Sequence, residues 1–475
     1  MEINMKIKFK RIISSLFIAC MLIGSFAACG GDKNNSSSGD TGSGSSASAS
    51  GDSSGSIKVP SKDIPADSKY ADPDWDPYAS MPADIKGSTV RFATWRDHTQ
   101  SEGAGALSTM YDKIGIKCEL FIVPQSQYIS NLRTKIASGD IPDVCLSNEG
   151  DQSFPLTMEL LQPINKCSTI DLDEPFWDQG MIACCTYNGN VYMLNSIGST
   201  WVGADLVYYN KNLFEENGIK TPQEYYDEGE WTLDNLKKIL KDVRSIGSNY
   251  HGGAMQPQMV TNIFGTSFIK YDYKTGTFSN NVNDPNLVKA YQWYADVRDE
   301  GLLGGSNKEF MQGLTGIVIT DSYGLRKEGY FKDMSADDIG FIYLPTADAG
   351  GTQVYSANYR MYGVVAGAKN PNAGAYFIRY WLDNENYDLS QLCINEEATQ
   401  FYLDIGNHAA DEKFYSFDEA GGVTIGADRD LAFVNPVKNV PSAQVRTKVQ
   451  SVSNLVDSAV KNLNDIVSKA TAAYN

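Results

Sequence analysis

One stretch of the sequence decides the fold, TVRFATWRDHTQSEGAGALSTMYDKIGIKCELFIVPQSQYISNLRTKIASGDIPDVCLSN (residues 89–148). Apolar segments at 89–95, 116–124 and 142–148 predict strands, and the segments between them carry apolar residues at helical spacing. Gly115 ends the first helical pattern. Strand, helix, strand, helix, strand with connections this short predicts a parallel sheet with right-handed crossovers.

Polar and aromatic residues follow two strands of this predicted sheet. Ligands of parallel sheets bind beyond the carboxyl ends of the strands. The residues at those ends are Trp95, Arg96 and Asp97 after the first strand, and Asn148, Glu149 and Asp151 after the third. We therefore expect an aromatic face, a cation and several acceptors at one edge. The alternative for the two acids is a solvated loop, since acidic side chains are usually exposed.

A second α/β unit begins near Trp201. The segment ADLVYYN predicts a strand, and Asn210 is placed to cap the helix KNLFEENG, which ends at Gly218. Amphipathic helices follow at 231–243 and 285–299, then the strands GIVIT and DIGFIYLP. The run from Ser442 to Tyr474 is helical in period. Three tryptophans lie in or beside amphipathic helices and are expected in the core, namely Trp231, Trp293 and Trp381.

The N-terminus has the layout of an export signal followed by a tether. Basic residues precede the apolar run Ile12 to Ile23, and small residues then lead to Cys29. Residues 30–56 are almost entirely Ser, Gly, Ala and Asp, a composition that cannot bury enough surface to fold. The layout resembles a bacterial lipoprotein signal, although Phe26 stands where Leu is usual. The alternative is an uncleaved membrane anchor, which residues 12–28 could barely supply.

Composition narrows the partners. The chain of 475 residues has a formal charge of −18, which argues against nucleic acid and anionic lipid as ligands. Its length suits two lobes.

No Cys/His grouping suggests a metal site and no glycine loop suggests a nucleotide, so no metal or cofactor is expected. Buried free thiols are the interpretation favoured over disulfides for Cys118, Cys145, Cys167, Cys184, Cys185 and Cys393.

Residues 187–240 resemble carbohydrate-type extracellular solute-binding proteins of ABC importers (family 1, maltose-binding-protein-like). The motifs that carry the resemblance are Gly189 with Tyr192, then Tyr209-Asn210-Lys211, Pro222 and Trp231. The segments EGLL, GLTGIVITDSYG, IGFIYLP and VVAGAKNPNAGAYFIRYWL continue it in order, so that it covers nearly the whole chain from residue 87.

The resemblance implies an α/β, two-lobed periplasmic-binding-protein-like fold. Each lobe is expected to be a mainly parallel sheet flanked by helices, and a multi-segment hinge joins them near 195–201, near Thr315 and at 354–359. The expected divisions are a signal peptide (1–28), a disordered tether (29–56), lobe 1 (87–197 plus 315–353) and lobe 2 (200–312 plus 355–475).

It also implies ligand residues near the hinge. Trp201 lies at the first crossing, Tyr323 follows the strand GIVIT, and Tyr359 and Arg360 lie near the last crossing. Aromatic rings cover the apolar faces of sugars, while Asp, Asn and Arg pair with hydroxyls that would otherwise be buried without partners.

The expected function is therefore capture of a sugar or oligosaccharide, without catalysis, by a monomer anchored through Cys29 that delivers its ligand to ABC permease subunits. Peptide, polyol and polyamine ligands stay open. Two alternatives are a cell-surface lectin and a secreted glycoside hydrolase. A hydrolase needs two carboxylates flanking one bond, for which Glu149 with Asp321 is a candidate pair.

Overall fold

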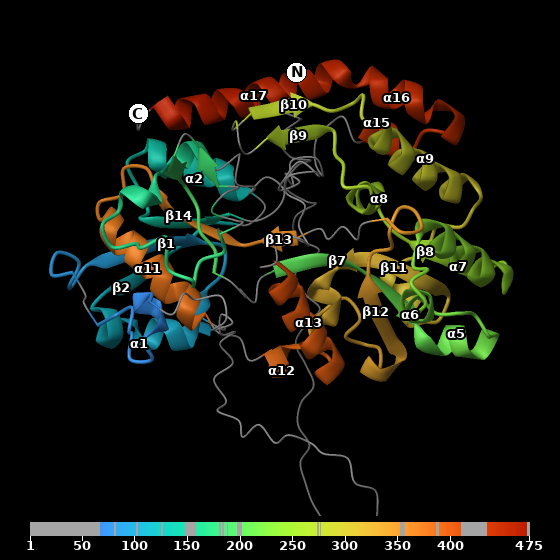
Figure 1. Ribbon diagram of the computed structural model, residues 1–475, viewed down its shortest axis with the longest axis horizontal. Helices are drawn as coiled ribbons and strands as arrows, with labels where there is room; N and C mark the ends of the chain where they lie inside the picture. Colours follow the sequence, from blue (N-terminus) through green and yellow to red (C-terminus); the bar gives the residue numbers. More distant parts are fainter. Residues whose placement is uncertain are drawn as a thin grey trace, which may run out of the picture. The chain divides into compact units, whose positions relative to one another are not determined.

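The structure is a computed structural model, whose course is drawn in Figure 1. It describes residues 67–79, 82–100, 103–124, 127–147, 158–179, 182, 185–187, 189–196, 202–272, 275, 277–351, 357–385, 389–409 and 435–472. The predicted signal peptide, the tether and Cys29 lie outside the described residues, as does Cys184.

The first sheet has the strand order β2-β1-β3-β14-β4. β1 (Thr89–Thr94) pairs in parallel with both β2 (Lys117–Ile122) and β3 (Val144–Ser147), which confirms the parallel sheet predicted for this segment. β14 (Met361–Val365) joins from far along the chain and runs antiparallel to β3 and to β4 (Leu161–Gln162).

Three helices belong to this sheet. α1 (Ala104–Ile114) and α11 (Pro371–Asn384) pack against it, and α2 (Tyr128–Ala137) connects β2 to β3 (Figure 1). α1 ends where predicted, because Gly115 adopts the left-handed conformation, with φ 61°, that glycine accepts without strain. We call this sheet and its helices the first lobe.

The second sheet has the order β12-β7-β11-β8, and β13 pairs with the start of β7. β7 runs antiparallel to β11, β12 and β13, whereas β11 runs parallel to β8, so this sheet is mixed and is not the mainly parallel sheet expected for the second lobe. Its strands are β7 (Val202–Asn210), β8 (His251–Ala254), β11 (Thr315–Asp321), β12 (Ile339–Tyr343) and β13 (Ala357–Tyr359).

Both faces of the second sheet are buried. Alternate residues of a strand point to opposite faces. In β7, Val207 and Tyr209 pack into one apolar cluster with the helices, whereas Leu206 and Tyr208 pack into the cluster that continues into the first lobe. The near-continuous apolar run of this strand therefore reflects burial on both sides.

The helices of the second lobe follow local signals in the sequence. Asn210 caps α5 by accepting a hydrogen bond of 3.0 Å from the Leu213 N–H, and α9 starts with Pro285 after the cap Asp284. The elements are α5 (Lys211–Asn217), α6 (Pro222–Asp227), α7 (Leu233–Ser245), α8 (Pro257–Ile263), β9 (Ile269–Asp272), β10 (Thr277–Asn280), α9 (Pro285–Asp299) and α10 (Asn307–Met311).

The C-terminal run expected as helical from Ser442 to Tyr474 is interrupted at Val452, between α16 and α17. Asn464 of α17 exchanges two hydrogen bonds, of 2.9 and 3.0 Å, with the backbone of Phe278 in β10. The remaining helices are α12 (Leu389–Leu392), α13 (Glu396–Ala409), α15 (Asn435–Lys438), α16 (Val445–Ser451) and α17 (Ser453–Ala472). The small strands β5 (Thr186–Tyr187) and β6 (Asn190–Val191) form a separate pair.

In the part of the chain that the structure describes, three segments lead from one sheet to the other, and we call them passages. Leu194 pairs with Tyr362 beside the first sheet, and β7 of the second sheet begins at Val202. Tyr359 pairs with β7 and Met361 with β3, so the chain returns at Arg360. The third passage follows α11, which ends at Asn384. The chain then reaches α12, and Cys393 just after that helix pairs with Arg326 of the second lobe.

Three expectations about the lobes are wrong at the level of strands. Residues 315–353 were assigned to lobe 1, but their strands β11 and β12 pair with β7 in the second sheet. Thr315 is not a crossing point, because it pairs with His251 of β8 inside that sheet. Conversely, β14 and α11 belong to the first lobe, although 355–475 was assigned to lobe 2. The remaining division into lobes stays a prediction.

The tryptophans expected in the core lie there. Trp231 and Trp381 are buried, and Trp293 is half-buried against the cluster that contains α7. The Trp231 indole N–H donates to the Tyr343 carbonyl over 2.8 Å, which ties α7's N-terminal turn to β12. The described cysteines carry free thiols, namely Cys118, Cys145, Cys167, Cys185 and Cys393.

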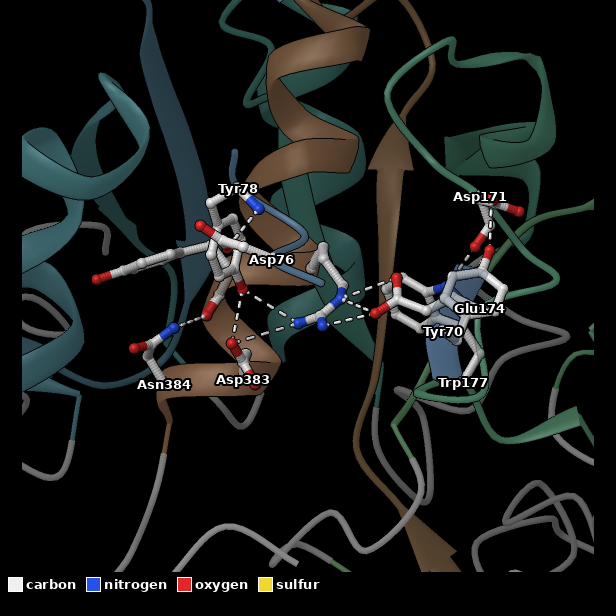
Figure 2. Close-up of polar contacts among 10 residues, drawn as sticks. Tyr70, Asp76, Tyr78, Asp171, Glu174, Trp177, Asp383 and Asn384 are labelled. Carbon is white, nitrogen blue, oxygen red and sulfur yellow. Dashed lines mark hydrogen bonds and ion pairs between the residues drawn. The ribbon is translucent and has the colours of Figure 1, made fainter. Parts of the chain in front are cut away.

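Residues 67–79 form an arm that docks on the first lobe. The Tyr78 hydroxyl donates to Asp383 over 2.8 Å and accepts from Arg379 over 3.1 Å. Its ring packs edge-on against Tyr380 at 5.7 Å between centroids. Figure 2 shows Tyr78 beside Asp383 at the end of α11. The structured part of the chain therefore starts before β1.

A buried ion pair lies beneath the arm. Arg379 contacts Glu174 through two nitrogens, with distances of 2.6 and 2.9 Å, and its guanidinium lies 3.6 Å from the ring centroid of Phe176. Burial raises the pKa of Glu174, an effect that the Arg379 guanidinium opposes. The pair joins α11 to the 171–178 loop within the first lobe.

The start of the arm contacts the same loop. Lys69 and the Tyr70 hydroxyl both bind the Asp171 carboxylate, and the Tyr70 ring packs edge-on against Trp75 at 5.1 Å. Lys69 and Asp171 are largely exposed, so solvent screens the attraction between them.

Replacing Trp231 by Ala should lower the free energy of unfolding by about 3–5 kcal/mol, because it leaves a cavity and an unpaired Tyr343 carbonyl. Thermal unfolding followed by circular dichroism measures the effect. Tyr226→Ala is the matched control, since that aromatic side chain is 42% exposed in the neighbouring helix α6. An equal loss in both variants would contradict the placement of Trp231 in the core.

Removal of the arm should destabilise the first lobe. A protein that starts at Asp67 should melt like the full chain, whereas one that starts at Pro82 should lose about 1–3 kcal/mol, because Arg379 and Asp383 lose the Tyr78 hydroxyl. Calorimetric melting of the two proteins measures the difference. Identical melting temperatures would mean that the arm adds no stability.

Candidate functional site

Trp95 follows the carboxyl end of β1. Its ring is half-buried and meets the Tyr128 ring edge-on, at 5.5 Å and 89°. Tyr128 is fully buried and donates its hydroxyl hydrogen to the Ala93 carbonyl over 2.9 Å, so it cannot move aside. Burial raises the pKa of Tyr128 well above its ordinary value, which keeps the phenol protonated. Trp95 is therefore a rigid, partly exposed aromatic surface.

Arg360 also contacts this ring. It directly precedes β14, which is separated from β1 by β3 in the sheet. Its guanidinium carbon is 5.3 Å from the centroid of Trp95, a cation–π distance. The side chain is only 5% exposed, and its Nη1 lies 3.7 Å from Oε1 of Glu385. Arg360, expected to contact ligand, thus contacts protein groups in this structure.

Glu385 is held by a second contact. The Tyr362 hydroxyl donates to Glu385 over 2.8 Å and accepts from the Trp381 indole N–H over 3.2 Å. Burial raises the pKa of Tyr362 well above its ordinary value, so the phenol stays a donor. Trp95, Tyr128, Arg360, Tyr362 and Glu385 together form what we call the first-lobe cluster.

Arg96 and Asp97 are exposed next to Trp95. Asp97 accepts hydrogen bonds from the Thr99 hydroxyl over 2.6 Å and from the Thr99 N–H over 3.0 Å. These bonds lower the pKa of Asp97, the hydroxyl contributing most, so that it is ionised at neutral pH. Both charged groups are within reach of solutes that approach the end of β1.

Four of the predicted site residues lie outside the described residues, namely Asn148, Glu149, Asp151 and Trp201. Tyr359 is described through its backbone, which pairs with Val202 at the start of β7. These positions stay predictions.

Tyr323 follows β11, as expected, in a short 3-10 turn (Ser322–Leu325). It is 38% exposed, and its ring meets that of Tyr330 edge-on at 5.2 Å. Asp321, which caps the turn, accepts from the Tyr323 N–H and from the Tyr330 hydroxyl, each over 2.9 Å. This end of β11 therefore presents an exposed ring beside an anchored carboxylate.

Sequence reasoning missed two residues of the same region. Asp205 of β7 lies opposite Asp321 of β11 in the strand register, is 4% exposed and accepts from Asn262 Nδ2 over 2.7 Å. Two carboxylates at directly opposed positions repel each other, and the donors around them offset that repulsion. A lone Asp within an apolar strand was the available signal. Asp205, Asn262, Asp321, Tyr323 and Tyr330 form the second-lobe cluster.

Both clusters adjoin the passages between the sheets. Asp205 stands next to Ala204, which pairs with Ala357 of β13, and Arg360 follows β13 directly. Each cluster offers aromatic surface together with ionised or hydrogen-bonding groups. This combination suits a neutral polyhydroxylated ligand better than a polyanion.

A polar hollow of about 480 Å³ lies elsewhere in the second lobe, and none of the predicted site residues lines it. Its side chains already have protein partners: Asn281 donates to the Asp284 carboxylate over 3.2 Å and to the Ser267 carbonyl over 3.0 Å, and Asn280 donates to Asp457 over 2.8 Å. We assign it to the architecture of the β9–β10 hairpin.

Within the described part of the chain, no group of three or more His, Cys, Asp or Glu side chains is arranged to hold a metal ion. None of the helices in that part is long and apolar enough to cross a membrane.

The family model for bacterial extracellular solute-binding proteins matches residues 107–390, which is more than half of the chain. The chain belongs to this family. Membership implies a location outside the cytoplasm, and the proteins of the family bind solutes.

Relatives and solved structures agree with this assignment. Curated binding proteins of Brucella abortus and Brucella suis are 23% identical over 224 residues, which is 45% of this chain and 49% of theirs. The chain thus matches about half the length of these relatives.

Three solved structures share the fold of this solute-binding protein, which is the two-lobed α/β fold predicted. The GacH receptor of Streptomyces glaucescens has a TM-score of 0.52 at 17% identity and covers 82% of this chain and 100% of its own. The sugar-binding protein MalE of Xanthomonas citri has a TM-score of 0.54 at 16% identity, with 81% and 99% covered. The cyclic α-maltosyl-1,6-maltose binding protein of Arthrobacter globiformis has a TM-score of 0.53 at 15% identity, with 80% and 99% covered.

Proposed function

We propose that this solute-binding protein captures a sugar or short oligosaccharide between its lobes, closes on it and delivers it to the permeases of an ABC importer. The observation that carries the proposal is Trp95, a rigid and half-buried ring at the carboxyl end of β1 with ionised groups beside it. A sugar needs an apolar surface for its C–H face and polar partners for its hydroxyls at one place.

Relatives support the choice of ligand class. The GacH receptor is described in complex with acarbose, and MalE of Xanthomonas citri is described as sugar-binding. The charge of −18 further disfavours polyanionic ligands.

The family match does not favour the lectin or the hydrolase. For the hydrolase, Asp321 would have to serve as one of two catalytic carboxylates. Its carboxylate already accepts hydrogen bonds from the Tyr323 N–H and the Tyr330 hydroxyl, which suits a fixed acceptor.

We further propose that Cys29 carries a lipid anchor at the outer face of the cell membrane. The small residues before it and the Ser/Gly-rich segment after it support this proposal. The protein is proposed to act as a monomer, without a cofactor.

Calorimetric titration should detect binding of maltotetraose, maltose or another neutral oligosaccharide, without product in the recovered ligand. Trp95→Ala should weaken that binding by about 1–3 kcal/mol, because a stacked ring is lost. Tyr111→Ala is the control, since that ring of the same lobe is 52% exposed on α1. Binding of spermidine, mannitol or a peptide alone would replace the sugar with another ligand class, and turnover would contradict a pure binding role.

Replacing Cys29 by Ala should abolish incorporation of radiolabelled palmitate and release the protein from the membrane fraction, because the acylated thiol is gone. Immunoblots of membrane and soluble fractions measure the release. Cys118→Ala is the control, since that thiol is half-buried in β2. Labelling that persists in the Cys29 variant would refute the anchor.

A further inference from the structure

Arg360 is the single residue between two strands of different sheets. Tyr359 pairs with Val202 of β7, and Met361 pairs with Ser147 of β3. The backbone hydrogen bonds on both sides fix Arg360 to both lobes. A change in the angle between the lobes must therefore alter the backbone at or near this residue.

Glu385 stands at another passage. It follows the last residue of α11, and its N–H donates to the Trp381 carbonyl over 2.6 Å. Further along the chain, the N–H of Ile394 donates to Leu325 over 2.9 Å and the N–H of Lys327 donates to Leu392 over 2.8 Å. Residues 392–394 thus pair with the second lobe.

A buried ion pair joins these two points. Arg360 and Glu385 are each 5% exposed, with 3.7 Å between Nη1 and Oε1. Burial of two charges gives little net stability, since the desolvation penalty offsets their attraction. What such a pair does provide is a fixed geometry, because either charge alone would be strongly unfavourable in this position.

The same guanidinium touches the proposed ligand ring. It lies 5.3 Å from the centroid of Trp95, while Tyr362 fixes the other oxygen of Glu385. A series of contacts thus links the Trp95 ring to Arg360 and Arg360 to Glu385. Arg360 belongs to one passage and Glu385 stands at the start of another.

We propose that Arg360 and Glu385 are positioning residues, whose ion pair holds two of the segments that join the lobes at fixed positions relative to Trp95. The pair thereby sets the distribution of open and closed lobes before ligand binds. The inference rests on the proposed function, since Trp95 is its ligand contact. A ligand shifts such a distribution only through its different affinities for the two states, so the ion pair also sets the apparent affinity.

Glu385→Gln tests the proposal in the full-length protein without ligand. The amide still accepts from Tyr362, but the partner charge of Arg360 is lost. Amide hydrogen exchange at residues 357–365 should become about tenfold faster or more, because the junction opens more often. The distance distribution between spin labels at Tyr111→Cys and Tyr226→Cys, one exposed position in each lobe, should broaden. The same labelling reaction on protein without these two substitutions measures how much spin label the native cysteines take up.

Glu174→Gln is the matched control. It removes the partner of Arg379, an equally buried pair on the same helix, but one that joins two segments of the first lobe. This variant should melt earlier, yet exchange at 357–365 and the distance distribution should stay as in the parent. The same broadening in this control would overturn the proposal, since loss of any buried pair would then suffice.

The double variant R360M/E385Q covers the case in which E385Q fails to fold. It removes both charges and keeps an apolar side chain over Trp95, a replacement that buried pairs often tolerate. The distribution should still broaden. A parent-like distribution in this folded variant would overturn the proposal, even if titration detects sugar binding. Failure of every ligand to bind would overturn the proposed function and leave these ligand-free results intact.

Discussion

The pairing of β14 with β3 is the constraint on which the rest of the structure depends. β3 ends the first run of strands, and β14 reaches it only after the chain has built most of the second lobe. Gly363 of β14 lies so close to Leu161 and to the Tyr192 carbonyl that a Cβ would come within 2.9 Å of each. Only a residue without a side chain therefore fits at the centre of this strand. Because β14 continues directly from β13, its register on β3 fixes where Arg360, the Trp95 surface and the end of α11 can lie.

Local features of the sequence predicted much of the fold. The Asn210 cap and the buried stripe of α7 follow from patterns within single segments, and the parallel pairing of β1 with β2 and β3 follows from the alternating pattern of residues 89–148. The assignment of 315–353 to the first lobe failed for the opposite reason. An apolar pattern predicts that a strand forms, but the strand with which it pairs depends on how distant segments pack. β11 and β12 are apolar strands, as β14 of the first sheet is, and their pairing with β7 assigns them to the second sheet.

The candidate site divides in the same way. Trp95 and Tyr323 were predictable because they follow strands whose ends a sequence can locate. The role of Arg360 was not, since nothing local reveals that Glu385 is its partner. Asp205 was missed because strand interiors are normally apolar, and the donor that makes this carboxylate tolerable, Asn262, comes from a helix far along the chain. Buried polar groups are stabilised by partners, and partners are a property of the fold.

The docked arm has a mechanical meaning for a chain held at a membrane by its N-terminus. Any pull on such an anchor would reach the described part of the chain at residues 67–79, load the exposed contacts of Asp171 first, and then reach Tyr78 and the end of α11. That path ends inside the first lobe. It does not run through Arg360, so a pull on such an anchor would load the first lobe directly and the second lobe only through the segments that join the two sheets. The first lobe would be the stationary part of an anchored receptor, and the second lobe the part that swings.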